Sequence, residues 1–121
     1  SQAEDDERLD NSPQFLTTSP PRTVLGRIAR ALTAMEAEPK VDETNYKIKA
    51  AILTPKGEIS VVVNVYALSD SLHFVEVHRG KGDLLEYNRI YQKLRTDIGD
   101  LVSKPSMSML PAGAAAAAAG T

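Results

Sequence analysis

The sequence contains no cysteine, and it has no apolar run long enough to cross a membrane. Without cysteine there can be no disulfide framework and no thiolate for catalysis or metal binding. A membrane-spanning helix needs about 20 consecutive apolar residues, and the acidic N-terminus is unlike the basic and apolar pattern of a signal peptide. These absences exclude thiol chemistry and argue against a transmembrane helix.

The residue patterns of common active sites are missing as well. No serine lies in a Gly-x-Ser-x-Gly elbow. The segment Gly80-Lys81-Gly82-Asp83 has an acid where a phosphate-binding loop has Ser or Thr, and that acid would repel phosphate. We therefore interpret the segment as a connection between a strand and a helix with an acidic cap. The paired acids Asp97 and Asp100 fall where that helix ends, and we interpret them as solvated carboxylates.

Three potential metal ligands, His73, Glu76 and His78, lie in one short segment. On a strand, His73 points to the face opposite Glu76 and His78. Two ligands on one face are too few for a zinc site. The sequence therefore predicts no bound metal and no cofactor. Because no catalytic set of residues is found either, we expect this chain by itself not to be an enzyme.

The charges are distributed unevenly along the 121 residues, which together carry a net charge of −2. Residues 1–13 contain five carboxylates and one arginine, a net charge of −4, so the remainder carries +2. That mild excess is far below the basic signature of nucleic-acid-binding domains, and we expect no nucleic-acid partner.

The chain divides into one domain with two tails. We predict a disordered acidic leader at 1–13 and a folded domain at 14–102, because acidic, polar stretches cannot bury a core. Residues 103–121 read as a disordered, alanine-rich tail, whose run of six alanines is too short to hold a helix alone. The length fits one small domain.

A helix is predicted to follow Ser19, which can cap it, with Pro20 and Pro21 in its first turn. Its apolar stripe then recurs with helical spacing, and the polar stretch 36–44 ends it. The stripe comprises Val24, Leu25, Ile28, Leu32 and Met35.

Three strands are predicted next, at 45–53, 58–68 and 71–79, because apolar and polar residues alternate in each. The turns between them are short, so the strands form an antiparallel meander. A second helix begins at Asp83, a cap supported by Glu86 three residues later. Its predicted apolar stripe comprises Leu84, Tyr87, Ile90, Tyr91, Leu94, Ile98, Leu101 and Val102.

These elements predict an α+β fold in which two helices pack on one face of a small antiparallel sheet. If the helices lie side by side, their basic residues could form one positive patch for acidic lipid headgroups or an acidic partner segment. Ordinary solvating charge is the alternative interpretation of the same residues. The patch would comprise Arg27, Arg30, Arg79, Lys81, Arg89 and Lys93.

Three segments together resemble the C-terminal kinase-associated regulatory domain of serine/threonine protein kinases. They are FLTTSPPRTVLGRI, NYKIKA and SLHFVEVHRGKGDLLEYNRIYQKL, in that order. The resemblance is strongest to plant kinases that interact with calcineurin-B-like calcium sensors. The C-terminal domain of checkpoint kinases is also similar, through the block Lys81-Gly82-Asp83 and Leu85-Glu86-Tyr87, so both parent subfamilies stay open.

The resemblance implies a non-catalytic regulatory domain that mediates autoinhibition of the kinase domain in cis. In the plant kinases, the segment around the first helix is a docking site for type 2C protein phosphatases, and it maps to Phe15, Thr17, Thr18, Val24 and Ile28. Gln14 and Leu16 depart from the family's usual Arg and Thr. A calcineurin-B-like calcium sensor and an anionic membrane are the other implied partners. The implied location is cytoplasmic or peripheral to the membrane, and nuclear for a checkpoint-type parent.

Overall fold

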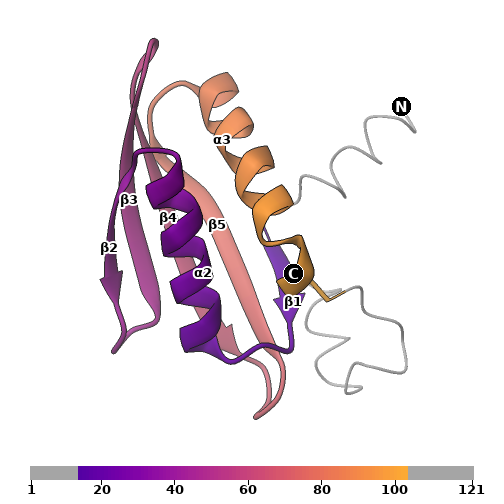
Figure 1. The fold of residues 1–121 in the computed structure, drawn as a ribbon. Coiled ribbons are helices and arrows are strands. Elements are labelled where there is room, and N and C mark those ends of the chain that lie inside the picture. The colour runs from indigo at the N-terminus through magenta and orange to yellow at the C-terminus, as the bar shows by residue number, and fades with distance from the viewer. Residues whose placement is uncertain (1–13, 104–121) are drawn as a thin grey trace, which may run out of the picture.

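The structure, a computed structural model, describes residues 14–103. Two helices cover one face of a five-stranded antiparallel sheet with the strand order β1-β5-β4-β3-β2 (Figure 1). The predicted α+β class, with both helices on one sheet face, is confirmed. The elements are β1 (Gln14–Thr17), α2 (Pro21–Ala34), β2 (Glu38–Asp42), β3 (Lys47–Thr54), β4 (Gly57–Ala67), β5 (His73–Lys81), α3 (Leu84–Asp97) and the 3₁₀ turn η1 (Gly99–Leu101).

The central strands alternate between the core and the open face, as their sequences predict. Along β4, four alternate apolar side chains are buried beneath the helices, while Ser60, Val62 and Asn64 lie on the other face and are only partly buried. The same alternation buries Val75 and Val77 of β5. This period of two gives the sheet one dry face, and the helices occupy it. The four buried residues of β4 are Ile59, Val61, Val63 and Val65.

Two strands were missed by the sequence prediction, and both lie at sheet edges. β2 falls inside the polar stretch that was expected only to end the first helix, and it pairs with β3 in the register Lys40↔Lys49. Polar residues and Pro39 are typical of edge strands, which must resist pairing with other chains. β1 has only four residues, too few for an alternating pattern, and it pairs with β5.

The start of α2 differs from its predicted cap. The structure places Pro20 at the cap position, without a side-chain hydrogen bond, and Pro21 begins the helix. Ser19 does not cap α2, because its backbone N–H donates to Thr17 Oγ1 at 3.1 Å and belongs to the preceding turn. The predicted stripe is otherwise confirmed, since Val24, Leu25, Ile28 and Leu32 are buried and Met35 is partly buried against the core.

Helix α3 begins as predicted. The Asp83 side chain accepts a hydrogen bond from the backbone N–H of Glu86 at 2.9 Å. Tyr87, Ile90, Tyr91 and Leu94 are buried beneath the helix, and Ile98 and Leu101 complete the stripe. Leu84 is the exception, because it is 53% exposed although its position falls on the predicted core stripe.

We expect Asp83→Ala to lower the free energy of unfolding by about 1 kcal/mol, because one helix-initiating N–H group loses its acceptor. Chemical denaturation followed by circular dichroism measures this difference. Asp83→Asn keeps a capping oxygen and should stay within a few tenths of a kcal/mol of the native protein. Equal losses in the two variants would show that the cap hydrogen bond is not the cause.

Candidate interaction surface

Arg27, on α2, is hydrogen-bonded to residues at and just beyond the end of α3. Its guanidinium donates to both carboxylate oxygens of Asp100, at 2.9 and 2.8 Å, and to the backbone oxygen of Asp97 at 3.2 Å. The hydrogen bond with Asp100 raises the pKa of Arg27, and the same bond lowers the pKa of Asp100. This forked contact joins α2 to η1, so Arg27 has a structural partner already.

Three predicted basic residues gather where β5 passes into α3. Arg79 donates to the backbone oxygen of Gly82 at 2.7 Å, and Lys81 pairs with Glu58 at 2.9 Å. Arg89 is 3.8 Å from Glu86 and remains 76% exposed. Such exposed pairs contribute little stability and are readily exchanged for other anions.

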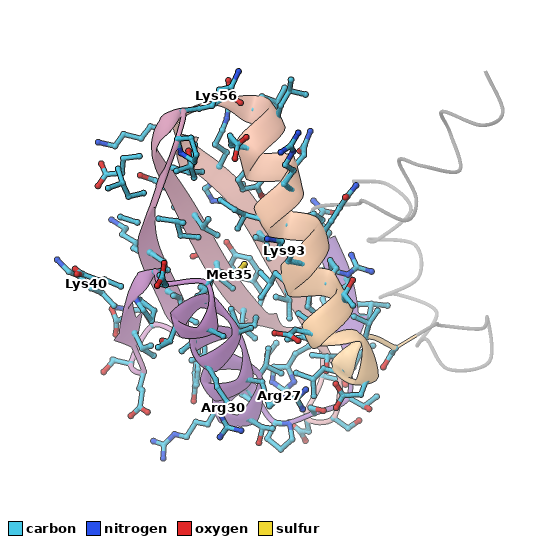
Figure 2. The ribbon with its side chains drawn as sticks, turned by 45° about the horizontal axis from the view of Figure 1, so that its top comes forward. Arg27, Arg30, Met35, Lys40, Lys56 and Lys93 are labelled. Atoms are coloured by element: carbon cyan, nitrogen blue, oxygen red, sulfur yellow. The ribbon has the colours of Figure 1, made fainter. Side chains whose placement is uncertain are left out.

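Arg30 and Lys93 make no ion pair with any residue that the structure describes. Arg30 lies with Arg27 toward one end of the helical layer, whereas Lys93 lies on α3 close to Met35 (Figure 2). The six predicted basic residues are therefore spread along the whole helical layer, with the group at the start of α3 lying apart from Arg27 and Arg30. Their spacing along the sequence could not reveal this separation, because it depends on how the helices cross the sheet.

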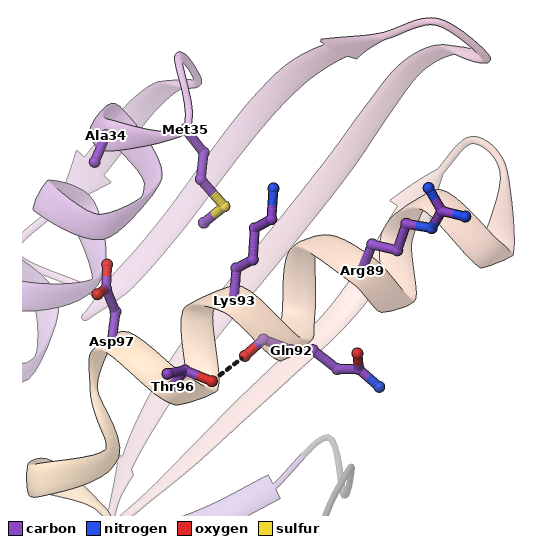
Figure 3. A pocket seen from close by; sticks show the side chains of 7 residues that line it. All are labelled: Ala34, Met35, Arg89, Gln92, Lys93, Thr96 and Asp97. Carbon is purple, nitrogen blue, oxygen red and sulfur yellow. Dashed lines mark hydrogen bonds between the residues drawn. The ribbon is translucent and has the colours of Figure 1, made fainter.

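A groove of about 740 Å³ lies between the end of α2 and the middle of α3 (Figure 3). Ala34 and Met35 line the α2 side, and the Lys93 side chain projects into the space from α3. The groove thus combines an apolar wall with an ammonium group, a pairing that suits a protein partner. The other lining residues are Arg89, Gln92, Thr96 and Asp97.

A second hollow, of about 530 Å³, lies against β2 and β3. Lys40 and Lys49 face each other directly across the strands, and Lys47 and Asn64 lie beside them. Asp42 also lines this hollow, but its oxygens accept from Asn45 and from the Thr44 backbone. The sequence prediction did not include this surface, because β2 was not recognised.

The three potential metal ligands lie as their strand positions predict. His78 Nε2 is 3.9 Å from Glu76 Oε1, whereas His73 alternates to the face of Val75. Among residues 14–103, no group of three or more metal-ligating side chains is gathered together. In the same part of the chain, neither helix is both long and apolar enough to cross a bilayer.

Proteins with similar sequences are plant kinases. CBL-interacting protein kinase 31 of Oryza sativa subsp. japonica is 31% identical over 105 residues, which cover 85% of this chain and 23% of the kinase. CBL-interacting protein kinase 3 of the same plant is 29% identical over 101 residues, 82% of this chain and 22% of the kinase. In Arabidopsis thaliana, CBL-interacting serine/threonine-protein kinase 26 is 37% identical over 70 residues, 56% of this chain and 16% of the kinase.

This chain is related to the C-terminal regulatory region of the CBL-interacting protein kinases. The resemblance stated from its sequence motifs is thereby confirmed. The chain spans less than a quarter of the length of these CBL-interacting kinases, 22% and 23% for the two rice proteins. No protein-family model matches the sequence.

Two solved structures have a fold similar to that of this chain. The adenylate sensor from AMP-activated protein kinase complexed with ATP matches with a TM-score of 0.59, covering 69% of this chain and 93% of that one. The same sensor in complex with 5-aminoimidazole-4-carboxamide 1-beta-D-ribofuranotide matches with a TM-score of 0.58. Sequence identities of 13% and 12% limit this likeness to the fold.

The segment that the CBL-interacting kinase resemblance assigned to phosphatase docking is largely buried. Phe15, Thr17, Val24 and Ile28 are at most 6% exposed, and only Thr18 is exposed. The Arg95 guanidinium lies 5.1 Å from the centre of the Phe15 ring and covers it from α3. A partner would therefore reach this segment mainly through Thr18.

Burial raises the pKa of Tyr87 from 10.0 to about 12. The folded protein keeps this phenol proton at pH values where the unfolded chain loses it. The corresponding stability is fully present below pH 10 and is lost as the pH rises toward 12. We expect a steep loss of stability in this window in alkaline titrations followed by circular dichroism. Tyr87→Phe should flatten it, and an unchanged profile would contradict the assignment.

Proposed function

We propose that this kinase regulatory domain is non-catalytic, and that it restrains a serine/threonine kinase by binding the catalytic domain in cis. The relation to the C-terminal regions of CBL-interacting kinases carries this proposal. A regulatory domain needs a surface for a partner rather than a reaction centre, and the groove between α2 and α3 supplies such a surface.

The groove has the composition of a protein interface. Met35 offers a flexible, polarisable side chain that adapts to an apolar partner surface. Lys93 projects into the same space and makes no ion pair with any described residue, so it is free to meet a partner carboxylate. A charge adjacent to apolar atoms gives orientation and specificity to such a contact.

The test is the affinity of the full chain for the catalytic domain of a CBL-interacting kinase, measured by calorimetry. We expect Lys93→Glu to weaken binding about tenfold, equivalent to about 1.4 kcal/mol, because the reversed charge repels the partner carboxylate. Lys40→Glu, on the edge strand away from the helices, is the matched control and should bind normally. Equal affinity for the native protein and Lys93→Glu would exclude the groove as the contact.

The same calorimetric titration distinguishes between the partners that the resemblance to these kinases implies. A type 2C protein phosphatase and a calcineurin-B-like calcium sensor are the two other candidates to be titrated. Thr18→Arg should affect only the phosphatase, because Thr18 is the exposed member of the docking segment. Binding of the phosphatase that is insensitive to Thr18→Arg would show that it docks elsewhere.

We propose an anionic membrane as the second candidate partner, because cationic and apolar side chains coincide at the start of α3. Leu84 and Leu85 are 53% and 69% exposed, and the sequence places them between Lys81 and Arg89. Basic residues that flank exposed leucines suit the surface of an anionic bilayer. This candidate would place the protein at the cytoplasmic face of a membrane. Co-sedimentation with phosphatidylserine vesicles tests it, and equal binding to neutral vesicles would contradict it.

A further inference from the structure

The sheet face opposite the helices carries a cluster of lysines on β2 and β3. Lys40 of β2 lies directly opposite Lys49 of β3, and Lys47 is two positions from Lys49 on the same face. The Lys40 side chain extends outward from the edge strand (Figure 2). Like charges that face each other across two strands repel and lower the stability of the pair. An anion bound between the lysines would relieve this repulsion.

The three lysines make no ion pair with any residue in the part of the chain that the structure describes. Asp42 faces Lys47 across the strands, but its two oxygens accept hydrogen bonds from Asn45 and from the Thr44 backbone. The hydrogen bond from the Asn45 side chain lowers the pKa of Asp42, so this carboxylate stays charged. Three ammonium groups and one carboxylate leave the cluster with a net charge of +2.

The hollow of about 530 Å³ against β2 and β3 brings these charges to one place. Neighbouring strands lie about 4.8 Å apart, and residues two positions apart on a strand lie about 6.6 Å apart. Lysine has a flexible four-carbon stem, so all three ammonium groups can converge on one anion. Asn64 lines the hollow opposite Lys47, and its amide donates to Glu76 over 3.5 Å, a bond long enough to yield to a closer acceptor.

A phosphate monoester matches this site in charge and in number of acceptors. It carries a charge of about −1.5 to −2 at pH 7 and has three strong acceptor oxygens. A carboxylate has one charge and two oxygens, so it would leave one of the three ammonium groups without a partner. Lysine binds phosphate as a point charge and needs no forked geometry.

An aromatic pair on the same sheet face indicates that the phosphate belongs to a polypeptide. Tyr66 follows Asn64 by two residues on β4 and is 48% exposed, and its ring centre lies 6.1 Å from that of Phe74 on β5. An apolar side chain near a phosphorylated residue can pack on these rings, whereas a free phosphate cannot use them. The exposed leucines suited to a bilayer, Leu84 and Leu85, lie on α3 in the helical layer.

We propose that the hollow over β2 and β3 binds the phosphate group of a phosphorylated segment of a protein partner. An apolar residue of the same segment packs on Tyr66 and Phe74. The site lies on the sheet face opposite the groove between α2 and α3, so the two surfaces can be occupied independently.

A short glycine peptide with one phosphoserine, and with phenylalanine two residues after it, tests this proposal on the full chain. Its titration at constant ionic strength is followed by nuclear magnetic resonance, and we expect the amide signals of Lys40, Lys47, Lys49 and Asn64 to shift. The Kd should be about tenfold lower than for the peptide with unmodified serine. Replacing its phenylalanine by glycine should weaken binding about threefold.

Matched variants locate the site. Lys49→Gln should weaken binding of the phosphopeptide about fivefold, because it removes one charge and keeps a long polar side chain. It should not lower the free energy of unfolding, since it removes a repelling partner of Lys40. Lys56→Gln is the control, because it makes the same substitution in the β3–β4 turn, away from Lys40 (Figure 2). Lys56→Gln and the groove variant Lys93→Glu should both bind the peptide normally.

Four results would overturn the proposal. The first is equal affinity for the phosphorylated and unmodified peptides, and the second is equal weakening by Lys49→Gln and Lys56→Gln. The third is binding of inorganic phosphate as tightly as the phosphopeptide, which would indicate a site for the free anion. The fourth is a shift of the same amide signals by phosphatidylserine vesicles but not by the phosphopeptide, which would assign this face to a membrane.

Discussion

Gly82→Ala is expected to lower the free energy of unfolding by about 3 kcal/mol, combining backbone strain with a steric clash. Gly82 has φ +106°, a conformation that favours glycine. A Cβ at this position would lie 2.5 Å from the backbone oxygen of Glu58 and 2.7 Å from Ile59 Cδ1. Either the turn or β4 must shift, and Gly82 immediately precedes the cap of α3. Chemical denaturation measures the loss.

Gly57 supplies the matched control for this prediction. It has φ +103°, but a Cβ there would meet no atom within 4 Å. Gly57→Ala therefore introduces strain without a clash, and we expect a cost of about 1 kcal/mol. If the two variants lose the same stability, the close approach of Gly82 to β4 contributes nothing, contrary to the structure.

Leu94→Ala is expected to cost about 3 kcal/mol of unfolding free energy, within the usual range for a buried leucine. Leu94 is fully buried at 0% exposure and belongs to the cluster that joins α3 to the sheet. Removing its branched end leaves a cavity in the core beneath α3. The groove depends on the position of α3, so partner binding should weaken along with stability.

Leu85→Ala removes the same atoms from the same helix at a position that is 69% exposed. We expect a change in unfolding free energy within about 0.5 kcal/mol, since little apolar area is uncovered. Thermal or urea denaturation of Leu94→Ala and Leu85→Ala separates the effect of lost burial from the effect of changed helix propensity, because both variants make the same substitution in α3. A large loss from Leu85→Ala would indicate that this residue is covered within the full chain.

The parts of the fold that the sequence predicts are those with a strong periodic signal. The alternation in β4 and the cap at Asp83 both appear in the structure as expected. The two missed strands have no such signal, because β2 is polar along an edge and β1 is too short to alternate. At Leu84 a clear periodic signal gave a wrong prediction. Its position on the helix indicates burial, but no described residue covers it.

The interaction surface was predictable in composition but not in arrangement. Lys93 and Arg89 were expected on α3, and both line the groove. Met35 was assigned to the core stripe, yet it also forms the groove's apolar wall. Arg27 was grouped with free cations, although Asp100 holds it through a contact between residues 73 positions apart. Long-range pairs of this kind form only when both helices have packed on the sheet. A local sequence pattern does not determine that arrangement.

The most direct test of a cis-acting regulatory domain is the phosphorylation rate of a CBL-interacting kinase catalytic domain titrated with this chain. We expect a saturable decrease in rate, and Lys93→Glu should need about ten times more protein for the same decrease, because groove binding is weakened. Lys40→Glu should inhibit like the native chain. A rate that stays constant throughout the titration would contradict the account.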